Sequence, residues 1–287
     1  DLAAGADGVM LDIPAGTDGG AVEIAHVGTG GSAHGRTGIR LGAGSRLTVI
    51  EHLADVGAEH WLNHRFDADL AEGANLTHII RAVNGAGLVT SRSFVRLSGS
   101  ARLSQLLMGL SAAALRADSE VHLAGAGAHA DVHGALIGGG SARQDALTRV
   151  RHVSPAATSD QKWRLLGGGR AAVSVSGGVE VARDAQGTAA EQSLKALLLA
   201  RGAVANLKPE LEIFADDVRC AHGCTVGALD RNALFYLESR GVAPAEARSL
   251  LTRAFVADVF AAIADQPLRD LLEGEAGTRL AAAASEA

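Results

Sequence analysis

The residues best suited to chemistry are the cysteines and histidine of the run Cys220-Ala221-His222-Gly223-Cys224. The run follows a strand-like segment, and in an extended chain residues 220, 222 and 224 project from one face. Thiolate and imidazole are ligands for soft and borderline metals. Alternate strand residues lie about 6.5 Å apart, so one strand does not readily close a tetrahedral site, and a fourth ligand must come from elsewhere, such as a partner chain. The competing interpretation is two small buried thiols beside a hydrogen-bonded histidine.

Other polar motifs favour structural roles. Asp216 and Asp217 are adjacent, and neighbouring strand residues point to opposite faces, so we expect surface acids rather than a carboxylate pair. The glycine-rich runs at 28–32 and 167–169 neither open a helix nor precede Gly-Lys-Ser/Thr. These runs therefore predict turns rather than phosphate-binding loops.

The eleven histidines are scattered along the chain. His129 and His133 flank Asp131, and we interpret this trio of alternate residues as a solvated strand face without a ligand. There is no Gly-x-Ser-x-Gly elbow, and nothing in the sequence brings a serine and a histidine together. The sequence therefore offers no nucleophile context for an enzyme.

Composition limits the class of protein. Apolar residues form 47% of the 287 residues but aromatic residues only 3%, so Leu, Val, Ile and Ala must fill the core, as suits a repetitive architecture. The net charge of −6 argues against a nucleic-acid surface, which needs a basic stripe. No run of about 18 apolar residues predicts a membrane span, and no secretory signal opens the chain. Two cysteines four residues apart cannot form a disulfide framework, so we expect a cytoplasmic protein.

Short strand-like runs separated by Gly, Asp or Ser fill residues 1–229, and they alternate apolar and polar side chains. A turn followed by an apolar strand recurs at 44–49, 73–79, 100–103, 118–121 and 202–207. Stacked strands share a core that a single one cannot bury. The pattern favours a mainly β fold, either a β-solenoid or, about equally well, a β-sandwich or jelly roll.

The character of the sequence changes at residue 230. Asp230 is a candidate N-cap for a helix that ends at Gly241, and Pro244 suits the first turn of a second helix. This second helix carries an apolar stripe able to engage a partner groove, consisting of Ala247, Leu250, Leu251, Ala254, Phe255, Val259 and Ile263. Pro267 predicts a break, followed by a short amphipathic piece and an Ala-rich tail. We therefore predict a strand domain over 1–229 and a helical domain over 230–287 that protects the open end of a solenoid.

The segment from Lys208 to Gly223 resembles the signature of the SufB/SufD family of iron–sulfur cluster assembly proteins. Its Ala-Asp-Asp-Val-x-Cys-x-His-Gly run, residues 215–223, is most similar to the SufD branch. The resemblance is loose over 20–140 and strong over 150–260. Cys224 departs from the pattern because Ala is usual there, and Gly187 and Ala189 replace the usual Lys and Asp.

The resemblance implies a right-handed parallel β-helix with a small C-terminal α-helical subdomain. It also implies a non-catalytic scaffold that pairs with a SufB-like subunit and docks a SufC-like ATPase, which hydrolyses the ATP. A homodimer through the β-helix is an alternative assembly. The family's N-terminal helical domain is missing from this sequence, so we expect it to be part of a longer protein.

The resemblance carries over to individual positions. His222 matches the histidine that acts in cluster formation at the interface with SufB, and Cys220 matches the neighbouring family cysteine. A transient iron–sulfur cluster is then shared with the partner, none is firmly bound to this chain alone, and Cys224 is a candidate extra ligand. The region that corresponds to SufC docking includes Leu234, Phe235, Tyr236, Arg240, Leu251 and Phe255.

Two other classes of function stay open. One is an enzyme on a β-solenoid, such as a polysaccharide lyase or a hexapeptide acyltransferase. The sequence has neither the convergent acidic and basic residues of the lyases nor the strict six-residue period of the acyltransferases. The other is a standalone metal-binding module, which would hold stoichiometric metal through residues 220–224.

Overall fold

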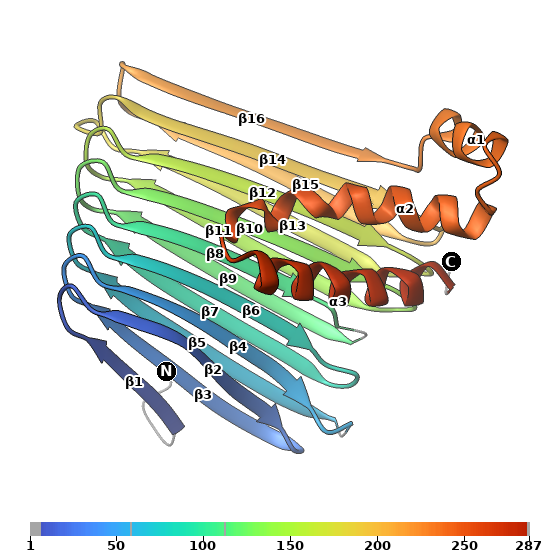
Figure 1. Cartoon of the computed structure of the whole chain (residues 1–287), viewed down its shortest axis with the longest axis horizontal. Coiled ribbons are helices and arrows are strands. Elements are labelled where there is room, and N and C mark those ends of the chain that lie inside the picture. The colour runs from blue at the N-terminus through green and yellow to red at the C-terminus, as the bar shows by residue number, and fades with distance from the viewer. Residues whose placement is uncertain (1–6, 58, 112, 286–287) are drawn as a thin grey trace.

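Successive strands of the chain wind into a β-solenoid with two parallel sheets, and a helical segment follows (Figure 1). The computed structural model describes residues 7–57, 59–111 and 113–285. Odd-numbered strands form one eight-stranded sheet and even-numbered strands form the other, so each coil contributes one strand to each sheet. The sequence pattern left a solenoid and a sandwich open, and the parallel pairing shows the solenoid.

The strand bounds follow this alternation. The sheet of odd strands contains β1 (Asp7–Ile13), β3 (Gly31–Leu41), β5 (His60–Leu70), β7 (Leu88–Leu97), β9 (Ala114–Leu123), β11 (Arg143–His152), β13 (Ala172–Val181) and β15 (Val204–Ile213). The sheet of even strands contains β2 (Asp18–Gly28), β4 (Arg46–Asp55), β6 (Asn75–Val83), β8 (Arg102–Gly109), β10 (His129–Gly138), β12 (Thr158–Gly167), β14 (Thr188–Leu198) and β16 (Val218–Gly227).

In every described coil except the last, the corner between an odd strand and the next even strand has a left-handed residue. These residues are Gly16, Gly44, Gly73, Ser100, Gly127, Ala156 and Gly187. Each donates its backbone N–H to a carbonyl of the next coil, so the corners stack. Glycine suits this conformation because it has no Cβ. The recurrences at 44–49, 73–79 and 100–103 mark these corners, whereas 118–121 lies in the middle of β9 and is not a turn.

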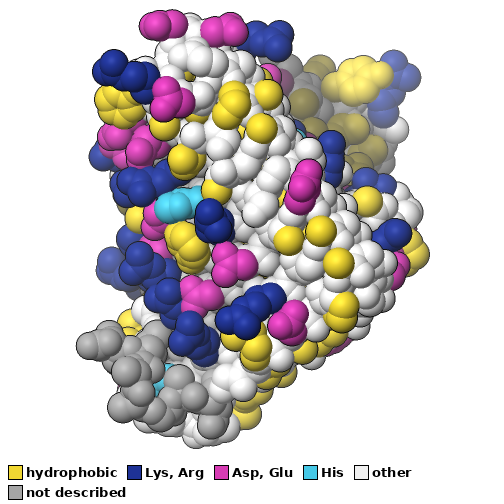
Figure 2. Space-filling model, turned by 90° about the vertical axis from the view of Figure 1, so that its left-hand side faces the viewer, with side chains coloured by type: hydrophobic (Ala, Val, Ile, Leu, Met, Phe, Trp, Pro, Cys, Tyr) yellow, Lys and Arg dark blue, Asp and Glu magenta, His cyan; other side chains and the backbone are white. Residues whose placement is uncertain are grey.

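The outer face of the odd sheet carries charges that pair between coils. Arg36 lies 3.1 Å from Asp67, and Arg151 lies 2.8 Å from Glu180. Figure 2 views the molecule from the side of the stacked corners and shows basic and acidic side chains interspersed there. Such mixed pairs add little stability individually, since they are exposed and screened by salt.

The interior has apolar regions near both corners of the coils. One contains Leu47, Leu76 and Leu103 from the even strands, and the other contains Leu53, Leu136 and Leu165. Alternation along the strands places every second side chain inward, and stacked coils bury those side chains together. Between the two apolar regions lie inward polar residues, including Glu51, His64, His78, Gln105, Gln161 and Gln192.

The helical segment contains α1 (Arg231–Ser239), α2 (Pro244–Ala257), the 3₁₀ helix η1 (Asp258–Ala262) and α3 (Gln266–Ser285). Asp230 caps α1, because its side chain accepts a hydrogen bond from the Asn232 N–H at 2.8 Å, as the sequence predicted. The residues after Pro267 form one long helix rather than a short piece and a tail. None of the described helices combines the length and the apolar character needed to cross a membrane.

The helices do not cover the open end of the solenoid, so this prediction was wrong. Instead, α2, η1 and α3 lie on the outer face of the even sheet (Figure 1). Val259 and Phe260 of η1 and Leu272 of α3 pack against outward residues of that sheet such as Leu106. The outer face of the even sheet is apolar in its middle strands, and burying it accounts for the position of the helices.

The buried His152 makes stability depend on pH. Burial lowers the pKa of His152 to about 4, although a backbone hydrogen bond at Ala157 acts in the opposite direction. The unfolded chain has a histidine pKa of about 6.5, so it binds more protons than the folded chain between pH 6.5 and 4. The stabilisation from a neutral His152 is therefore complete above pH 6.5 and lost as the pH falls toward 4. The free energy of unfolding lost over this pH range through His152 is about 3 kcal/mol.

Urea unfolding of the wild type and His152→Gln at pH 7 and pH 4.5 checks this effect. We expect the variant to lose less stability than the wild type on acidification. Equal losses would mean that His152 does not titrate with this shift.

Candidate functional site

The last coil leaves both sheets with a free strand edge. Among the described residues, β16 pairs only with β14 and β15 only with β13. In this register Cys220 lies opposite Ala190, His222 opposite Gln192 and Cys224 opposite Leu194. Those three β14 residues are buried and point inward. Residues 220, 222 and 224 therefore occupy the corresponding inward positions of the last coil, which no further coil covers.

The three positions differ in their surroundings. Cys220 is half-buried beside the small apolar cluster that includes Val179, Ala190 and Ala215. Burial raises the pKa of the Cys220 thiol, and a backbone hydrogen bond at Ala190 partly offsets this. His222 and Cys224 are exposed. Within the described residues, none of the three belongs to a group of three converging metal-ligand side chains.

The arrangement therefore presents ligand-type atoms at an open edge. A mostly protonated Cys220 thiol becomes a better ligand once a metal or a cationic neighbour draws off its proton. An unpaired strand edge also offers backbone N–H and C=O groups to an incoming strand. Whether these residues hold a metal or cluster remains a prediction.

The residues predicted to dock an ATPase lie at the outer end of the helical segment. Phe235 and Tyr236 of α1 are exposed, and the Arg240 guanidinium lies 5.2 Å from the centre of the Tyr236 ring. Leu251 and Phe255 line a groove beside the end of β14, and Leu234 lines a neighbouring one. The stripe predicted on the second helix is divided, because Ala247, Val259 and Ile263 are buried while Leu250 is exposed.

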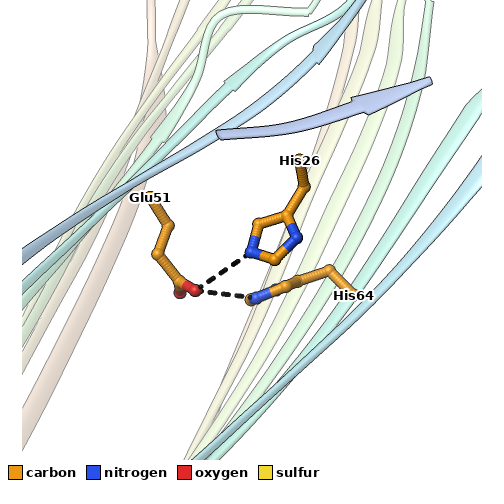
Figure 3. A group of neighbouring side chains, drawn as sticks. All are labelled: His26, Glu51 and His64. Carbon is orange, nitrogen blue, oxygen red and sulfur yellow. Dashed lines mark hydrogen bonds and ion pairs between the residues drawn. The ribbon is translucent and has the colours of Figure 1, made fainter. Parts of the chain in front are cut away.

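A second constellation, absent from the sequence prediction, lies inside the first coils. Glu51 of β4 is fully buried among His26 of β2, His64 of β5 and His78 of β6. Figure 3 shows the side chains of His26, Glu51 and His64 pointing toward one another. Burial by itself would raise the pKa of the Glu51 carboxyl, but hydrogen bonds from the three histidines hold it well below its usual range. The group is thus an ionised carboxylate within an imidazole shell.

Serines also contact histidines, contrary to the sequence interpretation. The Ser91 hydroxyl lies 3.0 Å from His64 Nδ1, and Ser159 lies 2.9 Å from His152 Nε2. The signal that could have found the first contact is the length of a coil. Glu51 and His78, like His64 and Ser91, are 27 residues apart, so they lie on neighbouring coils.

The interpretation of the His129-Asp131-His133 trio as a solvated face was wrong for His133. This residue is buried beneath η1, where its Nδ1 lies 3.0 Å from the Val259 carbonyl oxygen. Its Nε2 lies 3.2 Å from the Asp160 carboxylate. Burial would raise the pKa of Asp160, but hydrogen bonds from His133 and Lys162 lower it. The helices covering the sheet, which local sequence does not reveal, explain the difference.

Comparison with known proteins agrees with the fold and the sequence signature. The family model described as the SufBD core domain of SUF-system FeS cluster assembly matches residues 24–255. The iron–sulfur cluster assembly protein SufD of Escherichia coli K12 is 30% identical over 251 residues, which cover 87% of this chain and 59% of that protein. A SufBD family protein of Mycobacterium tuberculosis is 28% identical over 88% of this chain and 65% of its own length. The chain therefore spans less than two thirds of these relatives.

Proposed function

The chain belongs to the SufBD core domain family of iron–sulfur cluster assembly, and on that premise we propose that it is a SufD-like scaffold subunit. In this proposal it pairs with a SufB-like subunit and docks a SufC-like ATPase. ATP hydrolysis then takes place in the partner, and this chain is not an enzyme. The iron–sulfur cluster is cargo, held transiently at the subunit interface.

The observation that carries the proposal is the uncovered last coil. Its free strand edges lie beside Cys220 and His222, at inward positions that a further coil would cover. Val226 is 49% exposed at another inward position of β16, although it is apolar. A strand from a partner subunit would satisfy the free backbone groups and bury these side chains. It would also bring ligands to the Cys220 and His222 atoms, which this chain alone leaves spread along one strand.

The helical segment supports the second part of the proposal. Phe235 and Tyr236 are large exposed side chains on α1, whose residues are nowhere buried against the solenoid. Exposed aromatic residues beside a groove are typical of protein contacts. A partner seated there would contact Leu251 and Phe255 in the groove at the end of β14. The helices pack on the even sheet, so movement of this partner would be transmitted to the solenoid.

A pair of matched valines tests the interface. Val226→Arg places a charge at the last coil, and Val9→Arg places the same charge on β1 at the opposite end, where Val9 is 40% exposed. We expect Val226→Arg to weaken co-purification with the SufB-like subunit at least tenfold, about 1.4 kcal/mol, because the charge would be buried there. Val9→Arg should have no effect.

Thermal melting of each variant alone provides the control for folding. Equal co-purification of the two variants would refute the assignment of the interface to β16. A homodimer lost only in Val226→Arg would show that a second copy, rather than a SufB-like subunit, covers the edge.

For the compartment we propose the cytoplasm, because Cys220 and Cys224 are both free thiols.

A further inference from the structure

Three side chains inside the first coils converge on one point. His26, Glu51 and His64, here called the interior triad, offer one ligand atom each, and these atoms all lie within 4.8 Å of one another. Glu51 and His64 are fully buried, and the His26 side chain is 10% exposed. The three come from different strands, β2, β4 and β5, so the fold rather than a local motif assembles them (Figure 3).

One carboxylate oxygen faces both imidazoles of the triad. Glu51 Oε1 lies 3.0 Å from His64 Nε2 and 3.4 Å from His26 Nε2. The other oxygen, Oε2, is occupied by His78 Nε2 at 2.8 Å. The two carboxylate oxygens therefore differ in their contacts. Oε2 is held by His78, while the ligand-type atoms of His26 and His64 converge on Oε1.

Hydrogen bonds determine which proton His78 carries. The Gln105 amide donates to His78 Nδ1 at 3.1 Å, so the proton of the neutral ring is on Nε2 and is donated to Glu51. Ser119 fixes the Gln105 amide by donating to its Oε1 at 2.6 Å. His78 is thereby a positioning residue that orients the carboxylate.

His64 has a partner of the kind found behind metal-bound imidazoles. The Ser91 hydroxyl oxygen lies 3.0 Å from His64 Nδ1, so it can accept a proton from Nδ1 when a metal ion takes the place of the proton on Nε2. The Nε2 atoms of His26 and His64 thus face one Glu51 carboxylate oxygen, and a bound cation would replace the protons that lie between these groups in the metal-free chain. A cation at that point would satisfy all three.

We propose that the interior triad binds a divalent first-row transition-metal ion, with His26 Nε2, Glu51 Oε1 and His64 Nε2 as ligands. Two histidines and one carboxylate are a common ligand set for Zn²⁺ and for Fe²⁺. Three protein ligands leave a coordination position for water, and His26, the ligand nearest solvent, provides the route of access. The triad lies in the first coils and Cys220 and His222 in the last, so this site is independent of the proposed function.

The other converging group is less suited to a metal. This group consists of Asp131, His133 and Asp160. The Lys162 ammonium lies 2.6 Å from the Asp160 carboxylate oxygen that also faces His133. A cation is therefore already supplied by the chain at that position, whereas no Lys or Arg is paired with Glu51 among the described residues.

Titration of the chelator-treated full chain with Zn²⁺ tests the proposal, with stoichiometry and affinity measured by calorimetry and the ligand field by Co²⁺ absorption. We expect one high-affinity equivalent with a tetrahedral or five-coordinate Co²⁺ spectrum. His26→Ala and Glu51→Gln should each weaken it by about 100-fold or more, because each removes a direct ligand. His26→Ala changes the most accessible ligand, and melting without metal verifies that both variants fold.

Two controls separate this site from others. His122→Ala removes a histidine of the outer face that pairs with Glu120 and should leave binding unchanged. A Cys220→Ala/His222→Ala/Cys224→Ala variant should also still bind one equivalent of Zn²⁺. The proposal fails if no stoichiometric metal binds at neutral pH, or if binding is lost in the triple variant and kept in folded His26→Ala.

Discussion

Replacing His222 with Ala is expected to lower cluster formation by the assembled complex at least tenfold, about 1.4 kcal/mol in the barrier, while the complex still forms. His222 is exposed on β16 and lies opposite Gln192, so its removal leaves no cavity in the isolated chain. Changes at such surface positions usually alter stability by about 0.5 kcal/mol or less. An effect on cluster formation would therefore reflect the lost imidazole.

The measurement is the appearance of iron–sulfur absorption on the reconstituted complex, and transfer of the cluster to an acceptor apoprotein. Arg219→Ala is the matched control, because Arg219 is an exposed neighbour on the opposite face of the same strand. Cys224→Ala shows whether this thiol contributes as an extra ligand. Wild-type rates in His222→Ala, with the complex intact, would refute the assigned role of His222.

The two tryptophans are expected to differ sharply in their contribution to stability. Trp163 of β12 is 2% exposed, and Trp61 of β5 is 41% exposed. Trp163→Ala should lower the free energy of unfolding by about 3–5 kcal/mol, because it leaves a large cavity among closely packed coils. Trp61→Ala should cost about 1 kcal/mol, chiefly through the loss of its hydrogen bond to Thr90.

Gly134 of β10 provides a second test of the same packing. An added Cβ at Gly134 would lie 2.3 Å from Cζ3 of the Trp163 ring, so Gly134→Ala forces the ring to move. We expect a loss of about 1–3 kcal/mol. Gly178→Ala is the matched control on β13, where the nearest atom is 3.7 Å away. Denaturant unfolding followed by tryptophan fluorescence measures all four variants, and equal stability of the two glycine variants would contradict this packing.

Sequence reasoning predicted the strands better than their assembly. Alternation and corner residues such as Gly44 and Gly73 indicated short stacked strands, because both depend on local conformation. They could not decide between a solenoid and a sandwich, which differ in pairing between distant strands. The resemblance carried by residues 208–223 indicated the solenoid, and the parallel sheets confirm it.

The helical segment and the interior show where local patterns were insufficient. The N-cap at Asp230 was predicted because a cap is a local structure. The burial of Val256 and Phe260 against Leu106 was not, since it depends on an apolar outer face of a sheet formed by other coils. Glu51 and His78 escaped notice for the same reason, because they meet only once the chain has completed a coil.

The position of η1 on the even sheet sets its distance from the free edge of that sheet. η1 contacts β8, β10 and β12, and one further even strand, β14, lies between these strands and β16, whose outer side is the free edge. Inserting one complete coil between β12 and β14 would keep every inward side chain inward, yet it would shift the edge by one strand spacing of about 4.8 Å. The number of coils therefore sets the distance between the helices and the free strand edge. Insertions or deletions could change this distance only by whole coils.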